Sequence, residues 1–128
     1  MKAMFVSAAW FNWIVSFLLI FAVKDLFSLL GVAPLPTEPL FVHFLAIVVF
    51  VFGIGYYWAA KDFENHQNII KLGALAKLLL VAVGIIDWQL GIVSWQIMLI
   101  LVVDFVYSFL FYRACVRFRL AGFGLHAR

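Results

Sequence analysis

The stretch Lys71-Leu-Gly-Ala-Leu-Ala-Lys77 decides the fold, because it places Lys77 inside a segment that is apolar enough to lie in a membrane. Asp104 lies in a second such segment, within the apolar run 92–112. An ionised side chain near the centre of a bilayer costs about 2.5–3.5 kcal/mol on insertion scales, so it normally faces a bundle interior and has a partner. Lys77 and Asp104 are therefore candidate partners, in a pair that is either structural or functional.

The composition indicates an integral membrane protein. Of the 128 residues, 68% are apolar and 12% are charged, whereas soluble domains have about 45–50% and about 25%. We expect one membrane domain at 1–120 and a C-terminal tail at 121–128. The net charge of +3 is better explained by membrane topology than by nucleic-acid binding. The single Cys115 excludes an internal disulfide and a cysteine-based metal cluster.

Four apolar runs are long enough, at about 1.5 Å per residue, to cross about 30 Å of hydrocarbon. They predict an all-α, integral membrane four-helix bundle with spans at about 4–23, 40–60, 69–86 and 92–112. Between the first two spans, the segment 26–32 is too short to cross and is expected to be an interfacial turn or a helical extension. The prolines in 33–39 break the chain there, because proline lacks an amide donor and fixes φ. Residues 61–68 are expected to form a polar loop, in which Asn68 caps the third span.

Basic residues are concentrated on one side of the predicted membrane. Four spans put both termini on one side, and that side carries seven Lys or Arg residues against one, Lys24, on the other. The seven are Lys2, Lys61, Lys71, Arg113, Arg117, Arg119 and Arg128. The positive-inside rule therefore predicts cytoplasmic termini. Five of these residues, Lys61, Lys71, Arg113, Arg117 and Arg119, are also candidates for binding lipid headgroups, although the topology signal alone accounts for them.

Depth counting brings one small or polar residue from each span to a common layer. Asn12, Gly53, Lys77 and Asp104 each lie about eight residues, or about 12 Å, from the end of their span on the side of the termini. Residues three, four or seven positions away share a helix face, and on each span these neighbours include small or polar residues. Small residues let membrane helices approach closely, and polar residues hydrogen-bond between them. We therefore expect a compact bundle with a polar stripe facing inward on every helix.

Three interpretations of this layer are open. In the first, Lys77 and Asp104 form a structural ion pair that fixes the helix register. In the second, they belong to a ligand-binding pocket or a proton-sensitive site. The candidate ligand-binding residues are Asn12, Tyr56, Tyr57, Lys77, Asp104, Tyr107 and Ser108. In the third, Lys77 extends to the interface, and Asp104 pairs with another subunit or with Tyr and Ser hydroxyls.

Catalytic and cofactor-binding motifs are not evident. His43 has no second His at matched depth, which a bis-His haem would require. Asp62, Glu64 and His66 recur at every second residue and could hold a metal, but three polar residues in a loop are more often simply solvated. Gly53-Ile-Gly55 lacks the strand–turn–helix setting of a nucleotide-binding loop. We expect no catalytic residue, no metal and no cofactor.

The run Phe52-Gly-Ile-Gly-Tyr-Tyr-Trp-Ala-Ala-Lys-Asp62, followed by Asn65 and by Leu72-Gly-Ala-Leu-Ala-Lys77, resembles a pattern in small four-helix inner-membrane proteins of bacteria. These proteins are loosely similar to the DoxX-like group, some members of which are associated with quinone-linked redox complexes. The resemblance implies a multi-pass protein of the bacterial inner membrane. The first-helix pattern of the DoxX-like group is not evident here, so no functional residue is carried over.

Two classes of function agree with these patterns. The first is a non-catalytic accessory, scaffold or assembly subunit of a larger membrane complex, which predicts a well-packed interior, a fully paired Lys77 and Asp104, and an apolar flank. The second is a binder or carrier of a lipid, a quinone or a proton-coupled solute, which predicts a cavity lined by the polar layer. A membrane enzyme is the least favoured class. The expected partners are membrane lipids and either further copies of the chain or a larger complex, without nucleic acid.

Overall fold

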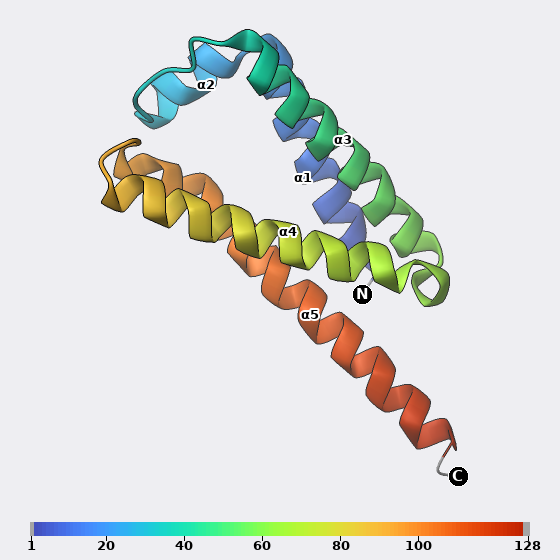
Figure 1. Cartoon of the computed structure of the whole chain (residues 1–128). Helices are drawn as coiled ribbons and strands as arrows, with labels where there is room; N and C mark the ends of the chain where they lie inside the picture. Colours follow the sequence, from blue (N-terminus) through green and yellow to red (C-terminus); the bar gives the residue numbers. More distant parts are fainter. Residues whose placement is uncertain (1, 127–128) are drawn as a thin grey trace.

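The computed structural model describes residues 2–126, and the side chains of residues 2–122. This part of the chain is helical and contains no strand (Figure 1). Its elements are α1 (Lys2–Phe21), α2 (Val23–Leu30), α3 (Pro39–Lys61), α4 (Phe63–Gln89), the short 3-10 helix η1 (Trp95–Ile97) and α5 (Met98–His126). Four helices are long and apolar enough to cross a membrane. The prediction of an all-α membrane protein with four candidate spans is confirmed at this level.

The helix ends differ from the predicted ends of the spans, first of all at the start of α4. The expected polar loop at 61–68 is wrong, because α4 begins at Phe63 and is capped by Asp62 rather than Asn68. One carboxylate oxygen of Asp62 accepts a hydrogen bond from the backbone N–H of Asn65 at 3.4 Å, and the other accepts one from the Asn65 side-chain amide at 2.6 Å. A kink remains at His66, where φ and ψ are not helical. Hydropathy locates the apolar part of a helix, whereas a cap decides where the helix begins.

The other ends are set by turns. α2 is the helical extension that was one of the two expectations for 26–32, and it stops at Gly31, whose φ of +77° is left-handed. Glycine adopts that conformation without steric penalty. The last span begins later than predicted, because Gly91 has a φ of +75° and η1 precedes α5. α5 also continues past 112 and enters the expected tail, remaining helical to His126. Residues 127–128 of that tail lie outside the described part.

The spans form a helix bundle that is built from two antiparallel pairs. α1 packs along α3, and α4 packs along α5, while α3 and α4 meet near the turn that joins them (Figure 1). Away from that turn the two pairs diverge (Figure 1), so the predicted bundle has its shared core at the α3–α4 end. The pairs are joined again at their far ends, where the backbone N–H of Ser94 donates to the Ala33 carbonyl at 2.7 Å and the Ala33 N–H donates to the Ser94 hydroxyl at 2.8 Å.

The hydrophobic core lies at the α3–α4 end, where both pairs meet. Phe5, Phe63 and Phe111 come from α1, α4 and α5, with ring centroids 5.3 Å apart for Phe5–Phe63 and 5.5 Å apart for Phe5–Phe111. Tyr56 of α3 completes the cluster, 4.9 Å from the Phe111 ring. Such aromatic contacts contribute about 0.5–1.5 kcal/mol each beyond the area they bury. This cluster holds the two pairs together.

Glycines permit the close helix contacts, as predicted for small residues. A Cβ at Gly53 of α3 would lie 3.3 Å from the Ala9 carbonyl oxygen and 2.6 Å from the Trp13 ring nitrogen. A Cβ at Gly73 of α4 would lie 2.7 Å from the Tyr56 hydroxyl. The first contact fixes α3 against α1, and the second fixes α4 against α3.

Candidate functional site

Lys77 and Asp104 form a direct ion pair between α4 and α5. The Lys77 ammonium donates to Asp104 Oδ1 at 2.6 Å, and each side chain is 8% exposed. The antiparallel packing of α4 on α5 brings the two residues to the same height. The interpretation in which Lys77 extends to the interface and Asp104 pairs elsewhere is therefore wrong.

Asn12 extends this pair into a polar layer that reaches all four spans. The Lys77 ammonium also donates to Asn12 Oδ1 of α1 at 3.4 Å. The Asn12 amide in turn donates to the backbone carbonyl of Val49 in α3 at 3.1 Å. A continuous chain of hydrogen bonds thus runs through Asp104, Lys77, Asn12 and Val49, from α5 to α3, and we call these residues the polar layer.

Three aromatic rings surround the Lys77 ammonium. The ring centroids of Phe11, Tyr56 and Tyr107 each lie 5.7 Å from its nitrogen. A cation over an aromatic face is stabilised by about 0.5–1 kcal/mol at exposed sites and about 2 kcal/mol or more when desolvated. Carboxylate, amide and rings together provide a polar environment for the cation in place of water.

The structure brings together most, but not all, of the predicted binding residues. Tyr56 is buried beside Lys77, whereas the Tyr107 hydroxyl lies 3.0 Å from the Ser7 hydroxyl and only its ring faces the ammonium. Ser108 donates to the Ala74 carbonyl at 2.9 Å. Tyr57 lies outside the layer, 37% exposed, under the Lys61 ammonium.

Phe11 is a member of the site that the sequence did not reveal. It is one of 15 phenylalanines, and nothing in its type distinguishes it from those that face lipid. The signal that could have found it is its position next to Asn12, at the depth of the polar layer. Ser16 lies four residues after Asn12 on the same face of α1. It is buried and donates to the Ala46 carbonyl at 2.7 Å, which ties α1 to α3.

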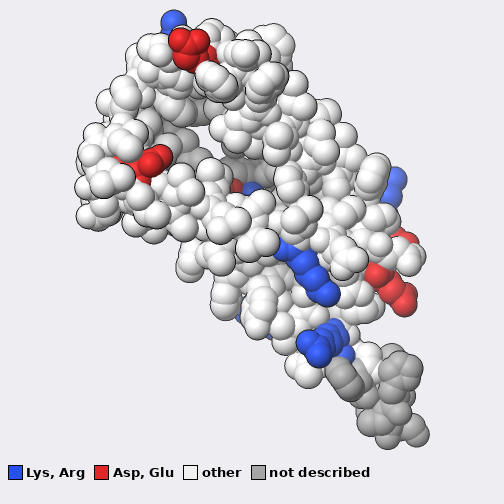
Figure 2. Space-filling model, in the orientation of Figure 1, with Lys and Arg blue, Asp and Glu red and all other residues white. Residues whose placement is uncertain are grey.

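The polar layer lies where the two helix pairs begin to separate. The core residues of α4 and α5 lie on the α3–α4 side of Lys77 and Asp104. Beyond the core, Figure 2 shows an opening between the two pairs, with an acidic and a basic side chain visible inside it. Counted over the whole residue, backbone included, Lys77 is 7% exposed and Asp104 is 6% exposed. The Lys77 ammonium thus has two hydrogen-bond acceptors and three rings around it, whereas Lys77 is the one hydrogen-bond partner of Asp104 among the described contacts.

The five basic residues proposed from the sequence for lipid headgroups are exposed, but they do not form one site. Lys61 is on α3 and lies 4.8 Å from the Tyr57 ring centroid. Arg113 of α5 lies 6.0 Å from the Phe109 ring. Lys71 of α4 lines a groove between α4 and α5, whereas Arg117 and Arg119 are exposed further along α5. Basic side chains gather towards that end of the molecule in Figure 2.

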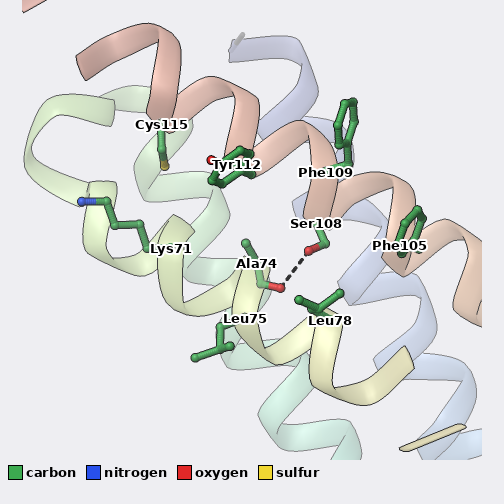
Figure 3. Close-up of a pocket in the computed structure, with 9 residues that line it drawn as sticks. All are labelled: Lys71, Ala74, Leu75, Leu78, Phe105, Ser108, Phe109, Tyr112 and Cys115. Atoms are coloured by element: carbon green, nitrogen blue, oxygen red, sulfur yellow. Dashed lines mark hydrogen bonds between the residues drawn. The ribbon is translucent and has the colours of Figure 1, made fainter. Parts of the chain in front are cut away.

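The α4/α5 groove has a volume of about 420 Å³ and opens on the outer face of the pair (Figure 3). Its lining residues are Lys71, Ala74, Leu75, Leu78, Phe105, Ser108, Phe109, Tyr112 and Cys115. Lys77 and Asp104 are not among them. The groove is therefore separate from the polar layer, although Ser108 was predicted to belong to that layer.

Asp62, Glu64 and His66, which were considered as metal ligands, lie at the start of α4, where Asp62 and His66 make local contacts. The hydrogen bond from the Asn65 side chain lowers the pKa of the Asp62 carboxyl below its ordinary value. The His66 ring nitrogen Nδ1 lies 2.7 Å from the Asp62 carbonyl oxygen. Among residues 2–126, no three His, Cys, Asp or Glu side chains are grouped so that they could hold a metal ion.

Comparisons of the chain with protein-family models, with curated proteins and with solved structures give no match. The resemblance to DoxX-like proteins stays a prediction. Any argument for function must therefore come from the polar layer, the hollow beside it and the surface of the helix pairs.

Proposed function

We propose that the chain is a multi-pass protein of a bacterial inner membrane, with cytoplasmic termini, and that it is a non-catalytic accessory, scaffold or assembly subunit of a larger membrane complex. The observation that carries the proposal is that the Lys77 ammonium is enclosed by Asp104, by Asn12 and by three aromatic rings. A catalytic centre keeps a group free to meet its substrate. Here the layer connects four helices and supports a structural role.

The outer surface agrees with a subunit that contacts other membrane helices. Only 17–33% of the residues in the most apolar window of each span are buried within the chain. Only 22% of the most apolar window of α3 is buried within the chain. Its outward face carries the large side chains Phe41, Phe44, Ile47, Val48 and Val51. Without a hydrophobic driving force in lipid, such faces associate by shape and van der Waals packing.

The test is cross-linking in native membranes, followed by affinity purification and quantitative mass spectrometry of proteins and small molecules. We expect a defined set of membrane proteins at fixed stoichiometry with the chain. The same proteins should be recovered with the double variant Lys77→Met/Asp104→Leu, which keeps the layer filled but removes its charges. Loss of the partners in the double variant, while the chain remains folded, would contradict a purely structural layer.

The hollow favours a second function, a binder or carrier of a lipid, a quinone or a proton-coupled solute at the polar layer. This proposal rests on the opening in Figure 2 and on the remaining exposure of Lys77 and Asp104. It predicts that a small molecule purifies with the chain and is lost from Asp104→Asn, even when no partner protein is present. A monodisperse chain with neither protein nor small molecule bound would contradict both functions.

A further inference from the structure

The α4/α5 groove has the shape and polarity of a site for one lipid chain. Ala74 and Ser108 form its floor, where the Ser108 hydroxyl is bonded to the Ala74 carbonyl across the two helices (Figure 3). Both have small side chains, which leaves a trough between the larger walls. The walls are Leu75, Leu78, Phe105 and Phe109. Because the floor hydroxyl already has its acceptor, the inner part of the groove offers an apolar ligand no unsatisfied polar group.

Apart from the Ser108 hydroxyl, which is bonded to the Ala74 carbonyl, the polar side chains of the groove lie at one end. Figure 3 shows Lys71, Tyr112 and Cys115 together at that end, whereas Leu78 and Phe105 lie at the other. The nine lining residues include one cation and no carboxylate. Arg113 follows Tyr112 and lies against the Phe109 ring, which adds a second positive charge beside the same end. This arrangement matches an apolar chain with an anionic head.

The length of the groove matches one leaflet of a membrane. Its lining on α5 runs from Phe105 to Cys115, which is about 15 Å at about 1.5 Å per residue. A bilayer core is about 30 Å thick, so one leaflet is about 15 Å. The basic end of the groove is also the end nearest the other exposed Lys and Arg side chains, where headgroups lie. A lipid in that leaflet would thus enter with its head at Lys71 and its tail along the apolar walls.

We propose that the α4/α5 groove binds one anionic phospholipid, with the phosphate of the headgroup at Lys71 and one acyl chain between α4 and α5. The site is independent of the polar layer and does not depend on the proposed scaffold function. It also does not require the hollow between the helix pairs.

The first test is native mass spectrometry of the delipidated chain, titrated with phosphatidylglycerol or with phosphatidylcholine of the same acyl chains. We expect one phosphatidylglycerol to bind preferentially. Lys71→Gln should weaken that binding about fivefold, the loss expected for one basic residue near an anionic headgroup. The matched control Lys61→Gln removes an exposed Lys from α3 outside the groove and should leave the affinity unchanged. Equal losses in the two variants would overturn the site, because they would indicate diffuse attraction to the basic surface.

The second test uses Cys115, which is the single cysteine of the chain and lines the groove. Alkylation by N-ethylmaleimide in detergent should slow as phosphatidylglycerol is added, and should slow less in Lys71→Gln. Cys115→Trp should reduce the binding of phosphatidylglycerol, because the indole occupies the groove. The proposal would be overturned if inorganic phosphate alone protected Cys115 from alkylation. It would also be overturned if phosphatidylglycerol did not change the alkylation rate. Thermal unfolding of each variant verifies that it is folded, and neither test depends on a partner protein.

Discussion

At the scale of single residues, the stability of the buried Lys77 ammonium depends on how many protein groups replace the water that would surround it in solution. Desolvation of an ion pair can exceed the attraction between the charges unless further hydrogen bonds and dipoles compensate. Asn12 supplies one hydrogen bond at 3.4 Å, and three rings supply the remaining contacts at 5.7 Å. Removal of one partner leaves the other charge buried and uncompensated. Removal of both leaves no buried charge, and Asn12 keeps its hydrogen bond to the Val49 carbonyl.

This difference predicts opposite outcomes for a single and a double substitution. Asp104→Leu should destabilise the fold by about 3–5 kcal/mol, because Lys77 loses its carboxylate. Lys77→Met/Asp104→Leu should recover most of that loss, since apolar replacements of a buried pair are often neutral or stabilising. The measurement is reversible unfolding in mixed micelles. A double variant as unstable as the single one would show that the charges do more than neutralise each other.

The sequence predicted the members of the polar layer better than their surroundings. Charged side chains inside apolar spans are rare, so Lys77 and Asp104 could be matched by depth with each other and with the amide of Asn12. Tyr56 and Tyr57 are consecutive and of the same type, so the sequence offered no means of choosing between them. Only Tyr56 faces inward, at 1% exposed against 37% for Tyr57. The residue type of an apolar ring such as Phe11 carries no signal, because lipid and core favour the same side chains, so only its position next to Asn12 could have indicated it.

At the scale of elements, the closeness of two helices depends on whether a glycine on one helix packs against a buried side chain of the other. A Cβ at Gly73 would lie 2.7 Å from two atoms of Tyr56, which is 1% exposed. At Gly122 on α5, such a Cβ would have no atom within 4 Å among the described residues, apart from its chain neighbours and the backbone of its own helix. The same substitution should therefore have opposite effects at the two positions.

Gly73→Ala should destabilise the fold by about 1–3 kcal/mol, the usual effect of overpacking in a close-packed site. Gly122→Ala should be neutral or stabilise the fold by up to about 1 kcal/mol, because alanine loses less backbone freedom in a helix. Unfolding of the two variants under identical conditions measures both effects. Equal stability of Gly73→Ala and Gly122→Ala would contradict the close contact of α3 and α4.

The start of α4 should respond to pH through Asp62. Because the Asn65 hydrogen bond lowers the pKa of this carboxyl in the folded chain from 3.8, its contribution is present above the unfolded pKa and is lost as pH falls through the folded pKa. We expect the protection of the Asn65 backbone amide, measured relative to its intrinsic exchange rate, to fall as the pH falls below 3.8. Asp62→Asn should remove this pH dependence while keeping a good capping residue, and Glu64→Gln should leave it in place. Hydrogen exchange of the Asn65 amide followed by NMR would detect the change. A pH response that persists in Asp62→Asn would exclude this carboxyl as its origin.

At the scale of the whole molecule, the arrangement of the helix pairs could not be predicted from the sequence. In a soluble bundle an apolar face marks the side that is buried. Here every span is apolar on most of its surface, since lipid is as apolar as the core. The depth of a residue in the membrane could therefore be counted along the sequence, but the arrangement of the helices side by side could not be predicted from it. The opening between the pairs results from the core being confined to the α3–α4 end, with Ser94 and Ala33 joining the far ends.

The Ser94 contact should control how far the pairs separate. Its hydroxyl accepts the Ala33 N–H at 2.8 Å and donates to the Gly31 carbonyl at 3.4 Å, so Ser94→Ala removes both bonds but keeps the backbone contact. With Cys115 replaced by Ser, spin labels at the exposed residues Leu35 and Leu90 report the distance between the far ends in lipid nanodiscs. We expect a narrow distance distribution in the parent and a broader or longer one in Ser94→Ala. A second pair of labels at Lys61 and Arg113, near the core, should be unaffected. If the distributions of the parent and Ser94→Ala coincide at the far ends, the side-chain bonds do not restrain the opening, and the backbone bond from Ser94 to Ala33 is sufficient.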